Sequence, residues 1–283
     1  MSKLETRFPK KRALITGATT GFGEALTHAL AERGWNVVVT GLDEEAIKRT
    51  TDAVTQRGGK AMGLLLDVRD RSQWEKVRQQ VSEAWGGIDL LVNNAGVADA
   101  NKMVNMSDAD WNAMLSINLN GVINGCRAYA PDMLAQKSGH ILNMASAAGL
   151  FSFPEMANYS VSKAGVISLS ETLFTELSGA NIGVTVLCPA GFKSSLLDHA
   201  VREGRAATSD SSTGRIVKRD MESGRHTSET VAAFALRAME TGNLYAIPQP
   251  LYRLAWVLKR LAPNTFYKLI GWMYRNQRGP FAD

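Results

Sequence analysis

The stretch LITGATTGFGEAL, residues 14–26, is the strongest indication of the fold in this sequence of 283 residues. It starts with a short apolar run, continues through Gly17, Gly21 and Gly23 in the pattern T-G-x-x-x-G-x-G, and ends in an amphipathic run. Glycines at this spacing let the backbone turn tightly between a strand and a helix and approach a pyrophosphate, which then rests on the helix N–H groups. The stretch predicts a dinucleotide site, with a purely structural turn as the alternative.

Apolar runs typical of strands recur along the chain, and most of them are continuous rather than alternating, as expected where helices cover both faces of a sheet. The predicted strands are 13–16, 36–40, 61–66, 89–93, 140–144, 183–188 and 244–248. Helical patterns lie between them, including 23–33, 44–59, 111–136 and 157–178. This alternation predicts an α/β fold, a Rossmann-type doubly wound parallel sheet of about seven strands. We expect residues 1–250 to form the dinucleotide-binding and catalytic domain and residues 251–283 a C-terminal helical extension.

Bulk composition narrows the class of protein. The two cysteines, Cys126 and Cys188, cannot make a disulfide framework, and no cluster resembles a metal site, so we expect a reducing, cytoplasmic setting and no metal. The N-terminal residues lack the apolar core of a signal peptide. The formal net charge of +5 matches that of residues 251–283 alone, which hold six basic side chains and one acid. Because no nucleic-acid motif accompanies this local charge, no nucleic-acid partner is predicted.

A second motif, ANYSVSKAG at residues 157–165, places Tyr159 four residues before Lys163. On a helix this spacing puts both side chains on one face, which alone fits either packing or proton transfer. Ser146 follows a predicted strand, and open α/β sheets bind ligands at the carboxyl ends of their strands. A nucleophilic role for Ser146 is disfavoured, because no G-x-S-x-G elbow surrounds it and no partnered histidine is evident.

Six motifs occur in order: the glycine turn at 16–23, LDV at 66–68, NNAG at 93–96, Asn118 in SINLNG, Ser146, and Y-x-x-x-K at 159–163. Over about residues 10–250 the chain thereby resembles the single-domain type of the short-chain dehydrogenase/reductase family. The resemblance implies an NAD(P)(H)-dependent oxidoreductase that interconverts a secondary alcohol and a ketone or aldehyde. Two alternatives remain, a non-catalytic dinucleotide-sensing protein and a sugar-nucleotide epimerase or dehydratase.

The resemblance implies a catalytic set of Asn118, Ser146, Tyr159 and Lys163. A free tyrosine has a pKa near ~10, and a nearby ammonium favours its phenolate, so Tyr159 is the predicted acid/base and Lys163 its electrostatic partner. Ser146 would hydrogen-bond the substrate oxygen. Asn118 would hold a water in a proton relay; the alternative is a buried amide that satisfies helix backbone.

The resemblance also implies cofactor contacts, with Asp67 and Val68 at the adenine ring and Ser194 at the nicotinamide carboxamide. The loop after residue 188 departs from the family, because Ala190 stands where glycine is usual. The predicted contacts are Gly17, Thr19, Thr20, Gly21, Phe22, Gly23, Leu42, Asp67, Val68, Asn94, Ala95, Gly96, Tyr159, Lys163, Pro189, Gly191, Phe192 and Ser194.

The choice between NAD and NADP depends on the end of the second predicted strand. Gly41 stands where an acid would grip a ribose diol, and Leu42 where an arginine often marks NADP. Thr20 is not basic either, whereas Asp43, twenty residues after Gly23, leaves an NAD-type contact open. The absent acid at position 41 favours NADP(H) slightly.

The predicted substrate region is apolar. The stretch AAGLFSF at 147–153 and Phe192 flank the expected cleft, which favours a hydrophobic alcohol or carbonyl substrate. Residues 202–228, rich in Ser, Thr, Gly and charged side chains, predict a mobile surface connection, with a lid and a solvated loop as alternatives.

The basic C-terminal residues predict two short amphipathic helices, separated at Pro263, with Asn264 as N-cap of the second and with Trp256 and Trp272 among the basic residues. Apolar side chains recur at helical spacing: Leu254, Val257, Leu258 and Leu261, then Phe266, Leu269, Ile270 and Met273. Three alternatives stay open for these helices: packing on the core or cleft, a subunit contact, and peripheral membrane contact. We expect a homodimer or homotetramer.

Overall fold

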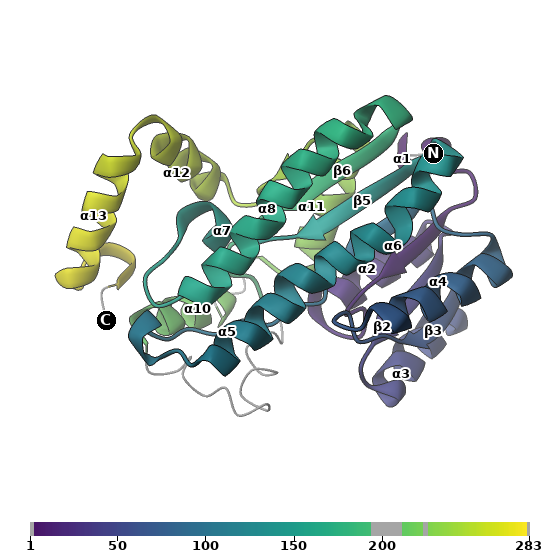
Figure 1. Ribbon diagram of the computed structural model, residues 1–283, viewed down its shortest axis with the longest axis horizontal. Helices are drawn as coiled ribbons and strands as arrows, with labels where there is room; N and C mark the ends of the chain where they lie inside the picture. Colours follow the sequence, from purple (N-terminus) through teal and green to yellow (C-terminus); the bar gives the residue numbers. More distant parts are fainter. Residues whose placement is uncertain (1–2, 194–210, 223–225, 282–283) are drawn as a thin grey trace.

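The computed structural model describes residues 3–193, 211–222 and 226–281 (Figure 1). A seven-stranded sheet forms the centre of the fold, in the order β3-β2-β1-β4-β5-β6-β7, and all its pairings are parallel. The strands are β1 Arg12–Ile15, β2 Asn36–Gly41, β3 Lys60–Leu65, β4 Leu90–Asn93, β5 Gly139–Met144, β6 Ile182–Leu187 and β7 Tyr245–Ala246. This arrangement confirms the predicted doubly wound α/β fold.

Helices cover both faces of the sheet (Figure 1). The longer ones are α2 Gly21–Glu32, α3 Glu44–Gln56, α4 Arg71–Trp85, α5 Asp108–Leu115, α6 Gly121–Gln136, α8 Ala157–Leu177, α11 Ser228–Thr241, α12 Pro250–Leu261 and α13 Pro263–Arg275. Three more are α1 Lys3–Arg7, α7 Ala147–Phe151 and α10 Ser212–Glu222. Helices α4, α6 and α8 pack on one face of the sheet, whereas α2 and α11 pack on the other.

Two apolar cores result from the alternation of side chains along the strands. Leu14 and Leu91 belong to the core beneath α4, α6 and α8. Their neighbours Ile15 and Val92 belong to the core beneath α2 and α11. All four side chains are fully buried, which explains why the strand sequences are continuously apolar.

Helix starts differ in a way that bears on the site. Asp43 caps α3 by accepting hydrogen bonds from the backbone N–H groups of Glu45 and Ala46, and Asp70 caps α4 in the same manner. The N-cap of α2 is Thr20, whose side chain makes no capping hydrogen bond. The helix that follows the glycine turn therefore begins without a side-chain cap on its N–H groups.

Several elements differ from the sequence prediction. The predicted helix 111–136 is interrupted by a π-helical turn, η2 Ser116–Asn120. The region 202–228, predicted as a surface connection, contains α10. Helices α4 and α11 had not been identified from the sequence.

The two C-terminal helices are present, but the predicted N-cap of the second is wrong. Ala262 occupies the N-cap of α13 and Pro263 its first turn, a position where proline costs no hydrogen bond and its fixed φ suits a helix. Asn264 therefore lies inside the helix. None of the helices in the described ranges is long and apolar enough to cross a bilayer.

Candidate active site

A cavity of about 530 Å³ opens at the carboxyl ends of β1, β4, β5 and β6, which are neighbours in the sheet. Open α/β sheets bind ligands at this edge. The cavity brings together most of the predicted site residues: Gly17, Thr20, Gly21, Phe22, Asn94, Ala95, Gly96, Ser146, Tyr159, Lys163, Pro189, Gly191 and Phe192. Residues far apart in the sequence thus line one site.

The glycine turn is built for close backbone approach. Gly17 and Gly21 have positive φ values of 60° and 55°, a conformation that side chains rarely adopt. A Cβ at Gly23 would lie 2.1 Å from the carbonyl oxygen of Gly17, so no larger residue fits there. With the uncapped start of α2 beside it, this turn fits a dinucleotide pyrophosphate.

The NNAG segment holds this turn in place. The Asn94 side chain donates hydrogen bonds to the carbonyl oxygens of Thr16 and Gly17, at 2.9 and 3.0 Å. The Thr16 hydroxyl accepts from the backbone N–H groups of Asn94 and Ala95, both at 2.9 Å. The end of β4 and the glycine turn are therefore tied together by four hydrogen bonds.

Ser146 and Tyr159 both line the cavity. Tyr159 is buried near the start of α8, and its side chain faces that of Ser146, the N-cap of α7. Burial raises the pKa of Tyr159, and the neighbouring Ser146 hydroxyl partly offsets that rise. The two hydroxyls can thus converge on one substrate oxygen.

Lys163 lies one helical turn beyond Tyr159, and its Nζ is 5.8 Å from the centre of the tyrosine ring. Burial lowers the pKa of Lys163 to about 8, an effect that the neighbouring Cys188 opposes. A Cβ added at Gly96 would approach both Lys163 Nζ and Asn118 Oδ1, at 3.4 and 3.1 Å. Gly96 therefore lets the lysine and the asparagine lie close to the same stretch of backbone.

Asn118 is fully buried on the π-helical turn η2. Its Oδ1 accepts from the backbone N–H of Val97, and its Nδ2 donates to the carbonyl of Val97, both at 2.8 Å. The amide thus fixes the loop backbone that follows NNAG, rather than the helix backbone of the structural alternative. The predicted relay water stays a prediction.

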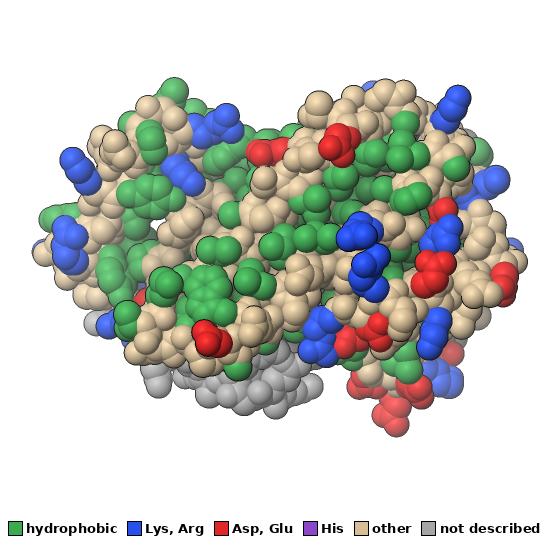
Figure 2. All heavy atoms as spheres, viewed as in Figure 1, with side chains coloured by type: hydrophobic (Ala, Val, Ile, Leu, Met, Phe, Trp, Pro, Cys, Tyr) green, Lys and Arg blue, Asp and Glu red, His purple; other side chains and the backbone are tan. Residues whose placement is uncertain are grey.

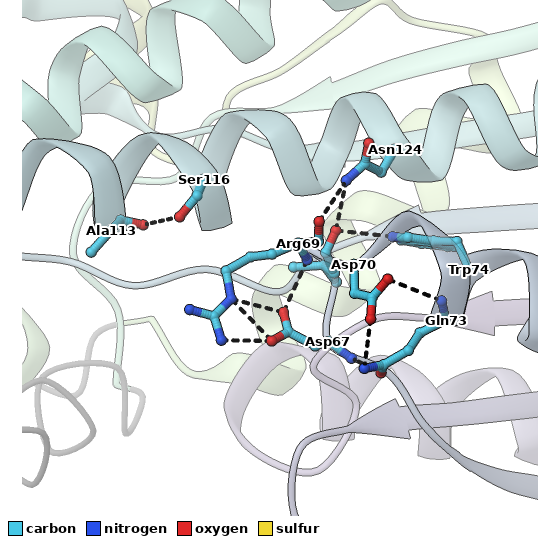
Figure 3. A network of polar contacts seen from close by, with 9 residues as sticks. Asp67, Arg69, Asp70, Gln73, Trp74, Ala113, Ser116 and Asn124 are labelled. Carbon is cyan, nitrogen blue, oxygen red and sulfur yellow. Dashed lines mark hydrogen bonds and ion pairs between the residues drawn. The ribbon is translucent and has the colours of Figure 1, made fainter.

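Five predicted cofactor residues do not line the cavity: Thr19, Gly23, Leu42, Asp67 and Val68. The Asp67 carboxylate is bound by the Arg69 guanidinium, at 2.6 Å, which lowers the pKa of Asp67 (Figure 3). The Val68 side chain is buried in the core, and its carbonyl accepts from Trp74 Nε1. Leu42 is 69% exposed. Ser194 lies outside the described residues.

The loop after β6 follows a defined path despite Ala190. The backbone N–H of Ala190 donates to the buried Gln249 side chain at 3.0 Å, and the Pro189 carbonyl accepts from the Ala147 N–H at 2.8 Å. Gln249 precedes α12, so this loop is linked to the C-terminal helices. Sequence reasoning did not identify Gln249.

The opposite end of the cavity is apolar and is lined by α10, α12 and α13. Glu155 connects two of these helices, because its carboxylate accepts from the Thr213 N–H and from the Tyr274 hydroxyl, both at 2.9 Å. The apolar side chains here include Phe151, Phe153, Met156, Ile216, Val217, Leu251, Tyr252, Phe266, Ile270, Met273 and Phe281. Sequence reasoning missed α10 and Glu155, since nothing local marks a single acid as a contact between distant helices.

A glycine turn that fits a dinucleotide, beside a serine–tyrosine–lysine set, defines a dinucleotide-dependent oxidoreductase. The family model for short chain dehydrogenase matches residues 11–205, and the chain belongs to the short-chain dehydrogenase/reductase family. It is an NAD(P)-dependent oxidoreductase.

Individual relatives agree with this assignment. The chain is 35% identical over 199 residues to the 3-oxoacyl-(acyl-carrier-protein) reductase FabG of Thermotoga maritima, covering 70% of this chain and 81% of the relative. It is also 35% identical to the probable oxidoreductase EphD of Mycobacterium tuberculosis, of which the match spans 30%. A short-chain dehydrogenase/reductase from Burkholderia phymatum, solved in complex with NAD, is 32% identical with a TM-score of 0.83, covering 95% of this chain and 96% of that one.

Proposed function

We propose that the chain interconverts a hydrophobic secondary alcohol and its ketone or aldehyde, with Tyr159 as acid/base. One observation carries the proposal: Ser146, Tyr159 and Lys163 line the same cavity as the glycine turn at one end and an apolar compartment at the other. A bound nicotinamide cofactor supplies or accepts the hydride. The protein must then hold the substrate oxygen and move one proton.

The roles follow from the positions of the side chains. Tyr159 gives its proton to the developing alkoxide during reduction and takes it back during oxidation. Ser146 donates a second hydrogen bond to the same oxygen. Lys163, as an ammonium, stabilises the phenolate form of Tyr159 and, by resemblance to the family, binds the nicotinamide ribose. Asn118 orders the backbone at Val97 and, in this proposal, a water that returns the proton.

The cofactor would lie along the edge of the sheet. The turn at 17–23 and the start of α2 would hold the pyrophosphate, and Asp67 and Val68 the adenine end. Pro189, Gly191 and Phe192 would hold the nicotinamide end, with Ser194 at the carboxamide. Residues 1–250 form the dinucleotide-binding and catalytic domain in this proposal, and residues 251–283 complete the substrate end.

For the adenine ribose we favour the 2′-phosphate of NADP(H). The Asp43 carboxylate, the candidate for an NAD-type contact, is engaged as the cap of α3. Arg49 is exposed and donates from its guanidinium to the Thr19 carbonyl at 3.3 Å, so a cation lies at the glycine turn. Position 41 carries no carboxylate to repel a phosphate. The NAD complex of the Burkholderia phymatum relative is the observation against this choice.

The substrate class rests on the lining of the cavity. Aromatic and aliphatic side chains from α7, α10, α12 and α13 surround the space beyond Ser146 and Tyr159. Phe151 stacks on Phe266, with ring centres 5.9 Å apart. Such a lining stabilises apolar groups by removing them from water and offers few partners for sugar hydroxyls. It therefore favours a lipophilic carbonyl over the sugar nucleotide of an epimerase.

A dinucleotide sensor without catalysis would need no buried acid/base tyrosine beside a lysine, so we favour the enzyme. We also propose a cytoplasmic protein that forms a homodimer or homotetramer. Exposed apolar side chains on α6 and α8, namely Leu134, Val161 and Phe174, support a subunit contact. Light scattering on the purified chain would measure its mass in solution.

The direct experiment is a panel of ketones and secondary alcohols of increasing chain length, assayed with NADPH and NADH by the absorbance of the reduced cofactor. The proposal expects kcat/KM to rise with the apolar length of the substrate. Polar sugar substrates preferred over apolar ones would contradict it, as would cofactor binding without turnover of any carbonyl.

A further inference from the structure

The outer face of the two C-terminal helices leaves an apolar stripe in solvent. Leu254 is 58% exposed and Leu261 is 78% exposed, although both lie in an ordered helix and neither lines the cavity. The other exposed apolar side chains on this outer face of α12 and α13 are Val257, Leu258, Leu269 and Trp272. Exposed apolar side chains gathered on neighbouring helices mark an interaction surface. We call this surface the outer apolar stripe.

Cations flank the outer apolar stripe on both helices. Arg260 lies on α12 and is exposed, and Lys268 and Arg275, also exposed, lie seven residues apart on α13. Side chains at this spacing share one face of a helix. The sequence from 241 to 282 contains no Asp or Glu. Figure 2 shows basic and hydrophobic side chains interspersed over this end of the molecule.

The inner faces of the same helices line the active-site cavity. Tyr252 and Ala255 of α12 and Phe266, Ile270 and Met273 of α13 all face it. Two hydrogen bonds hold these helices on the rest of the protein. The Tyr267 hydroxyl donates to the Phe151 carbonyl at 2.7 Å, and the Lys259 ammonium donates to the Leu150 carbonyl. One pair of helices therefore has an outer face for a partner and an inner face for the substrate.

We propose that α12 and α13 dock the protein on an anionic phospholipid bilayer, with the outer apolar stripe in the headgroup region and the substrate cavity directly behind it. Cations beside an apolar stripe with an exposed tryptophan have the chemistry that binds such interfaces. A second copy of the chain is a poorer occupant, because the two surfaces would bring like charges together without any acid to pair them.

The docking deepens the proposed function, since a lipophilic carbonyl dissolved in the bilayer would reach the cavity from the side of α12 and α13. Vesicle binding and turnover of a water-soluble ketone are separate measurements. Binding without turnover of any carbonyl would contradict the proposed function alone. Turnover without binding would contradict the docking alone.

The test is co-sedimentation of the full chain with vesicles of equal parts phosphatidylglycerol and phosphatidylcholine, compared with pure phosphatidylcholine. We expect binding to the anionic vesicles that weakens as salt is raised. The double variant Lys268→Gln/Arg275→Gln should weaken binding roughly thirtyfold, from the contribution of each cation near an anionic surface. The variant Leu254→Gln/Leu258→Gln should abolish it.

Matched controls carry the same substitutions elsewhere. Lys48→Gln on α3 combined with Arg57→Gln at its C-cap, and Leu134→Gln on α6, should bind vesicles like the unchanged protein. All variants should keep turnover of a water-soluble ketone without vesicles, which also shows that they fold. Equal binding by the unchanged protein and the C-terminal variants would overturn the proposal. So would concentration-dependent self-association that is lost in Leu254→Gln/Leu258→Gln, with no binding to anionic vesicles.

Discussion

The Nζ of Lys163 donates a hydrogen bond to the backbone carbonyl of Met144, 2.9 Å away, at the carboxyl end of β5. This contact holds the lysine in the buried space behind Tyr159, where little water can solvate its charge. Desolvation disfavours the ammonium form, and the pKa of Lys163 falls to about 8. Near neutral pH the site therefore holds a buried ammonium group, which lowers the free energy of unfolding of the protein.

This loss of stability gives a pH-dependent prediction. Between pH 8 and the ordinary lysine pKa of 10.5, the unfolded chain holds a proton that the folded chain has lost, so stability rises with pH in this window. In Lys163→Met this contribution is absent. The difference in free energy of unfolding between the two proteins, measured by urea denaturation without cofactor, should change by about 3 kcal/mol across the window. If the difference in free energy of unfolding stayed constant from pH 7 to 10.5, the pKa of Lys163 would not be lowered in the folded protein.

The glycine turn gives a second prediction. A methyl group at position 23 would meet the Gly17 carbonyl at 2.1 Å, so Gly23→Ala must displace the turn. We expect a stability loss of roughly 1–3 kcal/mol and cofactor affinity reduced more than tenfold. Gly179→Ala is the control, because nothing lies within 4 Å of its added methyl group. Titration by protein fluorescence measures the affinity, and unchanged binding in Gly23→Ala would argue against this turn as the pyrophosphate site.

The preference for NADPH over NADH tests whether Arg49 binds the 2′-phosphate of the cofactor. If this guanidinium binds a 2′-phosphate, Arg49→Gln should raise the KM for NADPH about tenfold or more, the contribution of a charge-assisted hydrogen bond. The KM for NADH should stay unchanged. Lys48→Gln, one residue earlier on α3, should alter neither constant. Parallel losses with both cofactors in Arg49→Gln would instead indicate damage to the Thr19 turn.

The apolar end of the cavity tests the substrate class. Ile270 lines the cavity, whereas the adjacent Leu269 is 53% exposed. Ile270→Ala should lower kcat/KM for the longest apolar ketone about tenfold or more, with a smaller change for a short ketone. Leu269→Ala should leave both unchanged in the absence of vesicles. The same loss for both ketones in Ile270→Ala would place the residue outside the substrate path.

Much of this fold was predictable because its signals are local. The glycine spacing at 17–23 and the continuous apolar strands identify a doubly wound sheet from neighbouring residues alone. The pair Tyr159 and Lys163 was predicted to share a face of a helix, and α8 places both at the cavity. Helix α4 also carried a local signal, since Trp74, Val77 and Val81 recur at helical spacing after the capping Asp70.

The substrate end was less predictable because tertiary contacts define it. Helix α10 presents Ile216 and Val217 to the cavity, an apolar face too short to stand out among polar neighbours. Glu155 connects α10 and α13 through partners more than fifty residues away in the sequence. The capping preference of Asn264 predicts it as the N-cap of α13, but Pro263 fixes the first turn and the N-cap is Ala262, two residues earlier.

The central claim is that Tyr159 transfers the proton, and single-turnover kinetics of Tyr159→Phe test it most directly. The variant keeps the ring that packs at the start of α8 and loses only the hydroxyl. Its affinity for NADPH, measured by titration, should therefore stay within about twofold of that of the unchanged protein. The rate of ketone reduction should fall by about a thousandfold or more, because no group is left to transfer the proton. Reduction at a rate comparable to the unchanged protein, with the cofactor bound, would contradict the account.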